Sequence, residues 1–103
     1  MIDIAGIKLF CGECANVMRN EIADESIDLV VTSPPYDNLR DYRGYTFSHA
    51  PIAFELTRVL KPGGVIVWVV GDEVIDRSES GTSFRHALFF LDACGLVLHD
   101  TMI

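Results

Sequence analysis

Apolar residues fall in two kinds of segment along the chain, short continuous runs and stretches with a helical period. Residues 27–32 (Ile-Asp-Leu-Val-Val-Thr) and 65–70 (Val-Ile-Val-Trp-Val-Val) are rich in β-branched residues and end at Pro or Gly. Such runs are typical of buried strands in a parallel sheet. Residues 7–11 form a shorter apolar run and residues 96–103 alternate, so both predict further strands.

Helical patterns occupy the segments between these strands. The spacing of apolar residues predicts helices over residues 13–21, about 49–60, and 82–94. Residues 34–47 and 73–81 lack a clear period and are predicted to be loops, and Lys-Pro-Gly-Gly at 61–64 is predicted to stop the second helix. This alternation predicts an α/β domain over residues 1–103, with about four strands in a mostly parallel sheet and three helices.

Composition narrows the class of protein. Half of the 103 residues are hydrophobic, which indicates a packed core rather than disorder. The net charge of −7 alone argues against nucleic-acid binding, although Arg40 and Arg43 both follow the Pro-Pro step. No apolar run reaches the roughly 18–20 residues of a membrane span, and the N-terminus lacks the pattern of a secretion signal. We therefore expect a cytoplasmic protein without membrane contact.

The three cysteines allow a thiol-based hypothesis. Cys11 and Cys14 form a Cys-x-x-Cys pair, which is compatible with a redox pair or half of a zinc site. A zinc site needs two more ligands, and Cys94 and the three histidines form no second close-spaced pair. We therefore predict no metal site, and interpret the pair as small residues near a strand end.

Three polar features follow predicted strands: Gly12-Glu13, Ser33 to Tyr36, and Gly71-Asp72. In open α/β sheets, ligands bind beyond the carboxyl ends of the strands. We therefore expect the three features to face one crevice, where Asp72 either lines the crevice or caps a loop. His49, His86 and His99 are interpreted as structural or surface residues, and Trp68, in the middle of a predicted strand, as a core residue.

The Ser-Pro-Pro-Tyr segment combines rigidity with hydrogen-bond acceptors. Neither proline has an N–H, and each restricts the residue before it to extended geometry. The segment therefore presents carbonyl oxygens, preceded by a hydroxyl and followed by an aromatic ring. This arrangement suits a planar substrate with an amino group, and the alternative is a rigid turn with a core tyrosine.

The wider context resembles the family of N4-cytosine and N6-adenine DNA amino-methyltransferases, in its permuted β arrangement. Residues 28–36 (Asp-Leu-Val-Val-Thr-Ser-Pro-Pro-Tyr) resemble motif IV of that family, and residues 39–42 (Leu-Arg-Asp-Tyr) resemble what often follows it. Residues 60–64 (Leu-Lys-Pro-Gly-Gly) are similar to a turn of Rossmann-like methyltransferases, and residues 9–18 resemble the opening of the β group. The resemblance covers nearly the whole chain, and its motif IV part is the most specific.

The resemblance implies a partial Rossmann-like sheet and methyl transfer from S-adenosylmethionine to an exocyclic amine of a flipped base in DNA. By analogy Tyr36 stacks on the base, while the Ser33 hydroxyl and the next carbonyl accept hydrogen bonds from the amine. The catalytic residues so implied are Ser33, Pro34, Pro35 and Tyr36.

The resemblance also implies cofactor and DNA contacts. Gly12 and Glu13, with Ser33 and Pro34, are implied on the cofactor, although the family usually has Asp where this chain has Glu13. Arg40 and Arg43 are predicted to contact DNA phosphates, with a solvated loop as the alternative.

Ser33 favours N4 of cytosine over N6 of adenine, because cytosine-N4 members of the family mostly carry Ser at this position. No cysteine follows a proline, which argues against the covalent route of cytosine-C5 enzymes. Methylation of an amine in RNA or protein is a further alternative, and relatives with that activity mostly show Asn-Pro-Pro-Tyr.

The glycine-rich Phe-x-Gly-x-Gly loop of the family does not occur in the sequence. In the β arrangement this loop lies C-terminal, after a target-recognition region. We therefore predict that the chain is the N-terminal, catalytic-motif half of a site-specific methyltransferase, completed by a missing C-terminal half or a complementing subunit. The alternative is a split subunit that only binds a partner. Unpaired sheet edges predict self-association or a rearranged first strand, and the isolated chain is expected to bind S-adenosylmethionine poorly.

Overall fold

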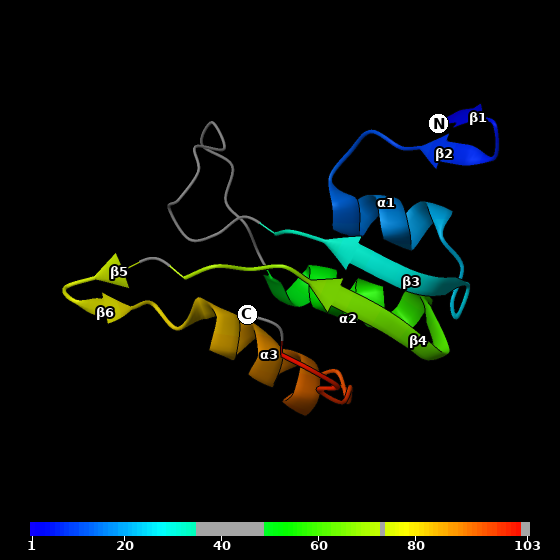
Figure 1. The fold of residues 1–103 in the computed structure, drawn as a ribbon. Coiled ribbons are helices and arrows are strands. Elements are labelled where there is room, and N and C mark those ends of the chain that lie inside the picture. Colours follow the sequence, from blue (N-terminus) through cyan, green and yellow to red (C-terminus); the bar gives the residue numbers. More distant parts are fainter. Residues whose placement is uncertain (35–48, 73, 102–103) are drawn as a thin grey trace.

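A computed structural model describes residues 1–34, 49–72 and 74–101 (Figure 1). These residues form an α/β structure with three helices and three two-stranded sheets. The helices are α1 (Cys14–Glu21), α2 (His49–Val59) and α3 (Thr82–Asp92). The strands are β1 (Ile2–Ile4), β2 (Ile7–Leu9), β3 (Ile27–Thr32), β4 (Leu60–Trp68), β5 (Val74–Ile75) and β6 (Ser78–Glu79).

The centre of the fold is the parallel pair β3–β4. Leu29 pairs with Val65 and Thr32 with Trp68, which confirms the predicted strands and their parallel direction. The register shifts between Ile27 and Leu29, because residues 61–64 bulge out of β4 where the sequence predicted a turn. Gly63 adopts a φ of 81° in this bulge, a conformation that suits glycine because it has no Cβ.

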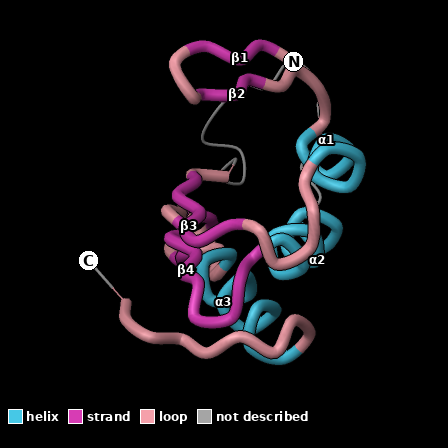
Figure 2. The backbone as a smooth tube through the Cα atoms, turned by 90° about the vertical axis from the view of Figure 1, so that its right-hand side faces the viewer, coloured by secondary structure: helices cyan, strands magenta, loops and turns pink. Residues whose placement is uncertain are grey.

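Helices cover one face of this pair. Figure 2 shows α1 and α2 on the same side of β3 and β4, and their buried residues form most of the core with Leu60 and Phe90 (Ala15, Met18, Ala53, Leu56 and Val59). The opposite face carries Leu29, Val31 and Val65, which are 57%, 66% and 52% exposed. The prediction of buried strands is therefore wrong for this face of the described residues.

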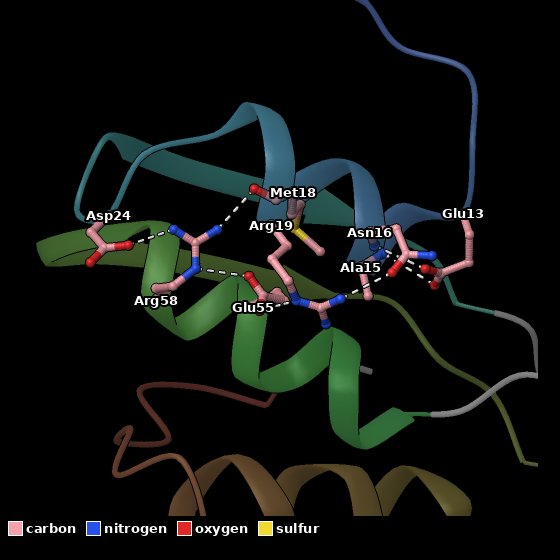
Figure 3. A network of polar contacts seen from close by, with 8 residues as sticks. All are labelled: Glu13, Ala15, Asn16, Met18, Arg19, Asp24, Glu55 and Arg58. Atoms are coloured by element: carbon pink, nitrogen blue, oxygen red, sulfur yellow. Dashed lines mark hydrogen bonds and ion pairs between the residues drawn. The ribbon is translucent and has the colours of Figure 1, made fainter.

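A polar network joins α1 to α2 (Figure 3). The Arg58 guanidinium bonds Glu55 at 2.8 Å, the Met18 carbonyl at 2.8 Å, and Asp24. Arg19 of α1 adds an ion pair to Glu55 at 3.4 Å. These contacts hold both helices in place at the end of the β3–β4 pair where β3 begins (Figures 1 and 3).

The first predicted strand is rearranged. Residues 7–9 form β2, which pairs antiparallel with β1 and not with the β3–β4 sheet. The two strands are joined by Ala5 and Gly6, both at positive φ (53° and 80°), the geometry of a tight hairpin turn. The hairpin lies apart from the central pair in both Figure 1 and Figure 2. The prediction of one sheet with about four strands is therefore wrong for the described residues.

The C-terminal segments also differ from the sequence prediction. Residues 74–79 form the short hairpin β5–β6 where a loop was predicted, and residues 96–101 form no strand where one was predicted. An apolar groove of about 1030 Å³ lies among β4, α3 and residues 96–101. No described helix is long and apolar enough to span a membrane.

Candidate active site

Ser33 and Pro34 follow β3 directly, at the carboxyl end of the parallel pair. The strand is held to its last residue, because the Val69 N–H donates to the Thr32 carbonyl at 2.9 Å. The position of Ser33 is therefore set by the pairing of β3 with β4. Gly71 and Asp72 follow β4 at the same edge, as the sequence predicted from strand direction.

Glu13 lies at the start of α1, toward the end of the molecule where β3 finishes (Figures 1 and 3), and Gly12 precedes it in the chain. Glu13 caps α1: its two carboxylate oxygens accept the backbone N–H groups of Ala15 at 3.1 Å and Asn16 at 2.9 Å. Gly12 has a φ of 156°, and a Cβ there would lie 2.9 Å from Val17 Cγ2. Local structure thus explains both residues, and their predicted cofactor contacts stay a prediction.

Asp72 has a capping role. Its carboxylate accepts the Ser83 backbone N–H at 2.7 Å and the Ser83 hydroxyl at 2.8 Å. The N-cap residue of α3, Gly81, offers no side-chain acceptor. Asp72 therefore accepts an N–H of the first turn of α3 that has no partner within the helix. The same bonds connect the start of α3 to the segment that follows β4.

An aromatic cluster lies beside this edge and was not predicted as a unit. The rings of His49 and His86 stack with centroids 4.1 Å apart and an angle of 14° between planes. Trp68 Nε1 donates to His86 Nδ1 at 3.1 Å, and its ring meets His49 edge-on at 5.4 Å. Phe89 and Phe90 meet the His49 ring edge-on at 5.0 and 5.2 Å.

The cluster keeps His49 neutral. Burial, and next the nearby His86, lower the pKa of His49 from 6.5 to about 4. Trp68 also places a constraint on His86, since an indole N–H can only donate and Nδ1 must then be unprotonated. The structural interpretation of both histidines fits these contacts, and His99 is exposed. Trp68 lies at the end of β4, not in its middle as expected.

The thiol hypothesis receives little support from the described residues. Cys11, Cys14 and Cys94 are free cysteines. Partial burial, and next the Glu13 carboxylate, raise the pKa of the Cys14 thiol, which disfavours the thiolate that redox or metal chemistry needs. Within residues 1–34, 49–72 and 74–101, no group of three or more His, Cys, Asp or Glu residues is arranged to hold a metal ion.

The remaining predicted site residues lie outside the described residues. These are Pro35 and Tyr36 of the Ser-Pro-Pro-Tyr segment and the two arginines, Arg40 and Arg43. Their roles stay predictions. Sequence reasoning missed the cluster of His49, Trp68 and His86, because its members are far apart in sequence and each alone has the appearance of an ordinary core or surface residue.

The edge of a parallel pair that ends in Ser-Pro is the site expected for an α/β enzyme that binds its substrate beyond the strands. The DNA methylase family profile matches residues 27–103, which includes β3, Ser33 and everything C-terminal to them. The chain therefore belongs to the DNA methylase family of N6 and N4 methyltransferases.

Named relatives agree with this membership. The chain is 58% identical over 86 residues to the orphan methyltransferase M.BamHII of Bacillus amyloliquefaciens, covering 84% of this chain and 32% of that protein. It is 40% identical over 75 residues to the type II methyltransferase M.BglII of Bacillus subtilis, covering 67% and 21%. It is 29% identical over 112 residues to the type II beta methyltransferase M.BslI of Bacillus sp. (strain NEB-606), covering 94% and 12%. The matched part is thus a third or less of each relative. No solved structure matches the chain.

Proposed function

We propose that this chain carries the motif IV part of a DNA methyltransferase, which transfers a methyl group to an exocyclic amine and prefers N4 of cytosine. The observation that carries the proposal is the position of Ser33, directly after a parallel strand inside the segment that the family profile matches. Relatives named as type II methyltransferases support a role in DNA modification, alone or beside a restriction enzyme. Such a protein would act in the cytoplasm.

The residues of the chain would act as hydrogen-bond acceptors and as a stacking surface. Ser33 Oγ and the Pro34 carbonyl would accept the two N–H groups of the amine and stabilise the positive charge that develops on nitrogen. Tyr36 would stack on the flipped base and Pro35 would keep the segment rigid, while Arg40 and Arg43 would hold the adjoining phosphates. Fixed acceptors need no rearrangement during the reaction, and the rigid prolines supply that property.

S-adenosylmethionine would supply the electrophilic methyl group when bound. The described residues fit a contact to part of such a cofactor, because Glu13 offers a fixed carboxylate whose oxygens each accept one N–H of α1 and keep a second lone pair. Gly12, Glu13, Ser33 and Pro34 would then form one side of the cofactor site. The matched part of M.BamHII is 32% of that protein, so we place the glycine-rich cofactor loop in further chain or in a second subunit.

The proposal is tested by labelled methyl transfer to DNA with the complete methyltransferase. Ser33→Ala removes one acceptor and is expected to lower kcat by about 100-fold or more. Ser26→Ala is the matched control, because Ser26 precedes β3 at its other end and its hydroxyl donates to the Ala23 carbonyl at 2.7 Å, while its backbone N–H bond to Val59 is kept in the variant. Equal rates for Ser33→Ala and Ser26→Ala would contradict the proposed role.

Calorimetry on residues 1–103 tests whether this chain holds only one side of the cofactor site, with the other side in further chain or in a second subunit. We expect binding of S-adenosylmethionine weaker than micromolar, because only one side of the site lies on this chain. A micromolar dissociation constant for the isolated chain would show that these residues form a complete cofactor site and would refute the division.

A further inference from the structure

Trp68 contacts both flanks of the stretch between Pro34 and His49. Its backbone pairs with Thr32, the last residue of β3, and so fixes the residue before Ser33. Its ring contacts His49, the first residue of α2, edge-on at 5.4 Å. One residue of β4 therefore holds the chain where it leaves β3 and where it enters α2.

His86 of α3 makes this arrangement rigid. It accepts the Trp68 indole N–H at 3.1 Å, and its ring stacks on His49 at 4.1 Å, so it contacts both partners at once. The helix that carries it is itself tied to the end of β4 through Asp72 and Ser83. Three elements, α2, β4 and α3, thus meet in one cluster of rings.

We propose that His49, Trp68 and His86 are positioning residues for the acceptors at Ser33 and Pro34. The His49–His86 stack holds the start of α2 against the end of β4. Because the end of β4 pairs with Thr32, this contact also fixes the backbone position of the next residue, Ser33. The catalytic consequence rests on the proposed function, whereas the cluster itself is independent of it. A misplacement of about 1 Å can lower the rate of such a reaction by roughly 100-fold, so a fixed position of these acceptors matters.

The cluster works only with neutral rings. Protonated Nδ1 of His86 cannot accept the Trp68 N–H, and two stacked imidazolium ions would repel each other. Burial and the neighbouring His86 also lower the pKa of His49 to about 4, so the neutral form is favoured.

Glu55 of α2 bonds Arg58 and Arg19, and Asp72 after β4 bonds Ser83. On α3, Arg85 donates to the Ser80 carbonyl at 2.7 Å. Acidification is therefore expected to act on the cluster through its histidines.

The first test measures kcat and KM of the complete methyltransferase at a temperature where every variant is folded. His49→Ala removes the ring and is expected to lower kcat about tenfold with little change in KM for DNA. His49→Phe keeps a stacking ring and is expected to restore kcat to within about twofold. His99→Ala is the control, since His99 is exposed.

The second test needs no catalysis. Trp68 is the only tryptophan, so its fluorescence reports the cluster alone. We expect emission of the chain to titrate with a midpoint near pH 4 and His49→Phe to abolish or shift this step. This result stands even where His49→Ala fails to fold.

Distinct outcomes separate the hypotheses. Unchanged kcat in folded His49→Ala, or equal losses in His49→Ala and His49→Phe, would overturn the positioning role. An identical Trp68 titration in His49→Phe would overturn the ring contact. No methyl transfer by the unaltered protein would overturn the proposed function, while the fluorescence titration would still decide whether the cluster exists.

Discussion

The cap that Asp72 provides to α3 allows a sharp stability test. Asp72→Ala removes two acceptors, one for the Ser83 N–H at 2.7 Å and one for its hydroxyl at 2.8 Å. Loss of a helix cap costs about 0.5–2 kcal/mol, and loss of a negative charge near a helix N-terminus adds about 0.3–1 kcal/mol. We therefore expect the free energy of unfolding to fall by about 1–2 kcal/mol.

Urea denaturation followed by Trp68 fluorescence measures this loss. With an m-value of about 2 kcal/mol/M, the midpoint is expected to fall by roughly 0.5–1 M with m unchanged. Asp72→Asn keeps one oxygen for the Ser83 N–H and is expected to lose less than Asp72→Ala. Asp92→Ala is the matched control, because Asp92 is exposed and ends the same helix, where a negative charge is unfavourable.

The losses at Asp72 and Ser83 are expected to be coupled, because the two side chains bond each other. Ser83→Ala removes only the hydroxyl bond, so the double variant with Asp72→Ala is expected to lose less than the sum of the two single losses. An Asp72→Ala variant as stable as Asp92→Ala would refute the capping role and would favour the alternative in which Asp72 lines a ligand site.

Three further perturbations test other contacts of the fold. Gly12→Ala places a Cβ 2.9 Å from Val17 Cγ2 and is expected to cost about 1–3 kcal/mol in urea denaturation. Gly95→Ala carries backbone strain at a φ of 74° but meets nothing within 4 Å, so it is expected to cost less, and equal losses would count against the close approach. Val59→Ala opens a cavity at a residue that is 1% exposed and is expected to cost about 2 kcal/mol in the same assay, so a loss under about 0.5 kcal/mol would contradict the described core. The fold lowers the pKa of His49 from 6.5 to about 4, so the folded protein favours the neutral imidazole. The free energy of unfolding is therefore highest above about pH 6.5 and falls as the pH drops toward 4. We expect this fall to be about 1–2 kcal/mol, because His49 is only partly buried. His49→Phe is expected to flatten this part of the stability profile, and an unchanged profile would refute it.

The central strands and the helices were readable from the sequence because their signals are local. Residues 27–32 became β3 at the predicted bounds, and the predicted helices at about 49–60 and 82–94 became α2 and α3, the latter two residues shorter. β-branched runs bounded by Pro or Gly, and apolar residues at helical spacing, specify these elements without knowledge of their neighbours.

The outer strands were not predictable in the same way, because a strand needs a partner. Residues 7–9 took β1 as their partner, and the apolar residues on either side of Ala5-Gly6 alternate as in a hairpin. The β5–β6 hairpin turns at Asp76 and Arg77, both at positive φ, with no glycine to mark the turn. Residues 96–101 lie across a groove from β4 and remain unpaired.

The site was predicted in part. The parallel direction of β3 and β4 was predicted correctly, so the ends of both strands lie at one edge of the pair. The function of Asp72 as a cap depended on the position of α3, which local sequence does not encode. The same holds for His49 and His86, whose stack joins two helices.

Mass spectrometry of nucleosides from DNA treated with the complete methyltransferase and isotope-labelled S-adenosylmethionine tests the central claim most directly. We expect labelled N4-methylcytosine, absent when Ser33→Ala replaces the unaltered protein and present with Ser26→Ala. Labelled N6-methyladenine would keep the amine chemistry and correct the base. Labelled 5-methylcytosine, or no labelled base with active, folded protein, would contradict methylation of an exocyclic amine by the Ser-Pro-Pro-Tyr segment.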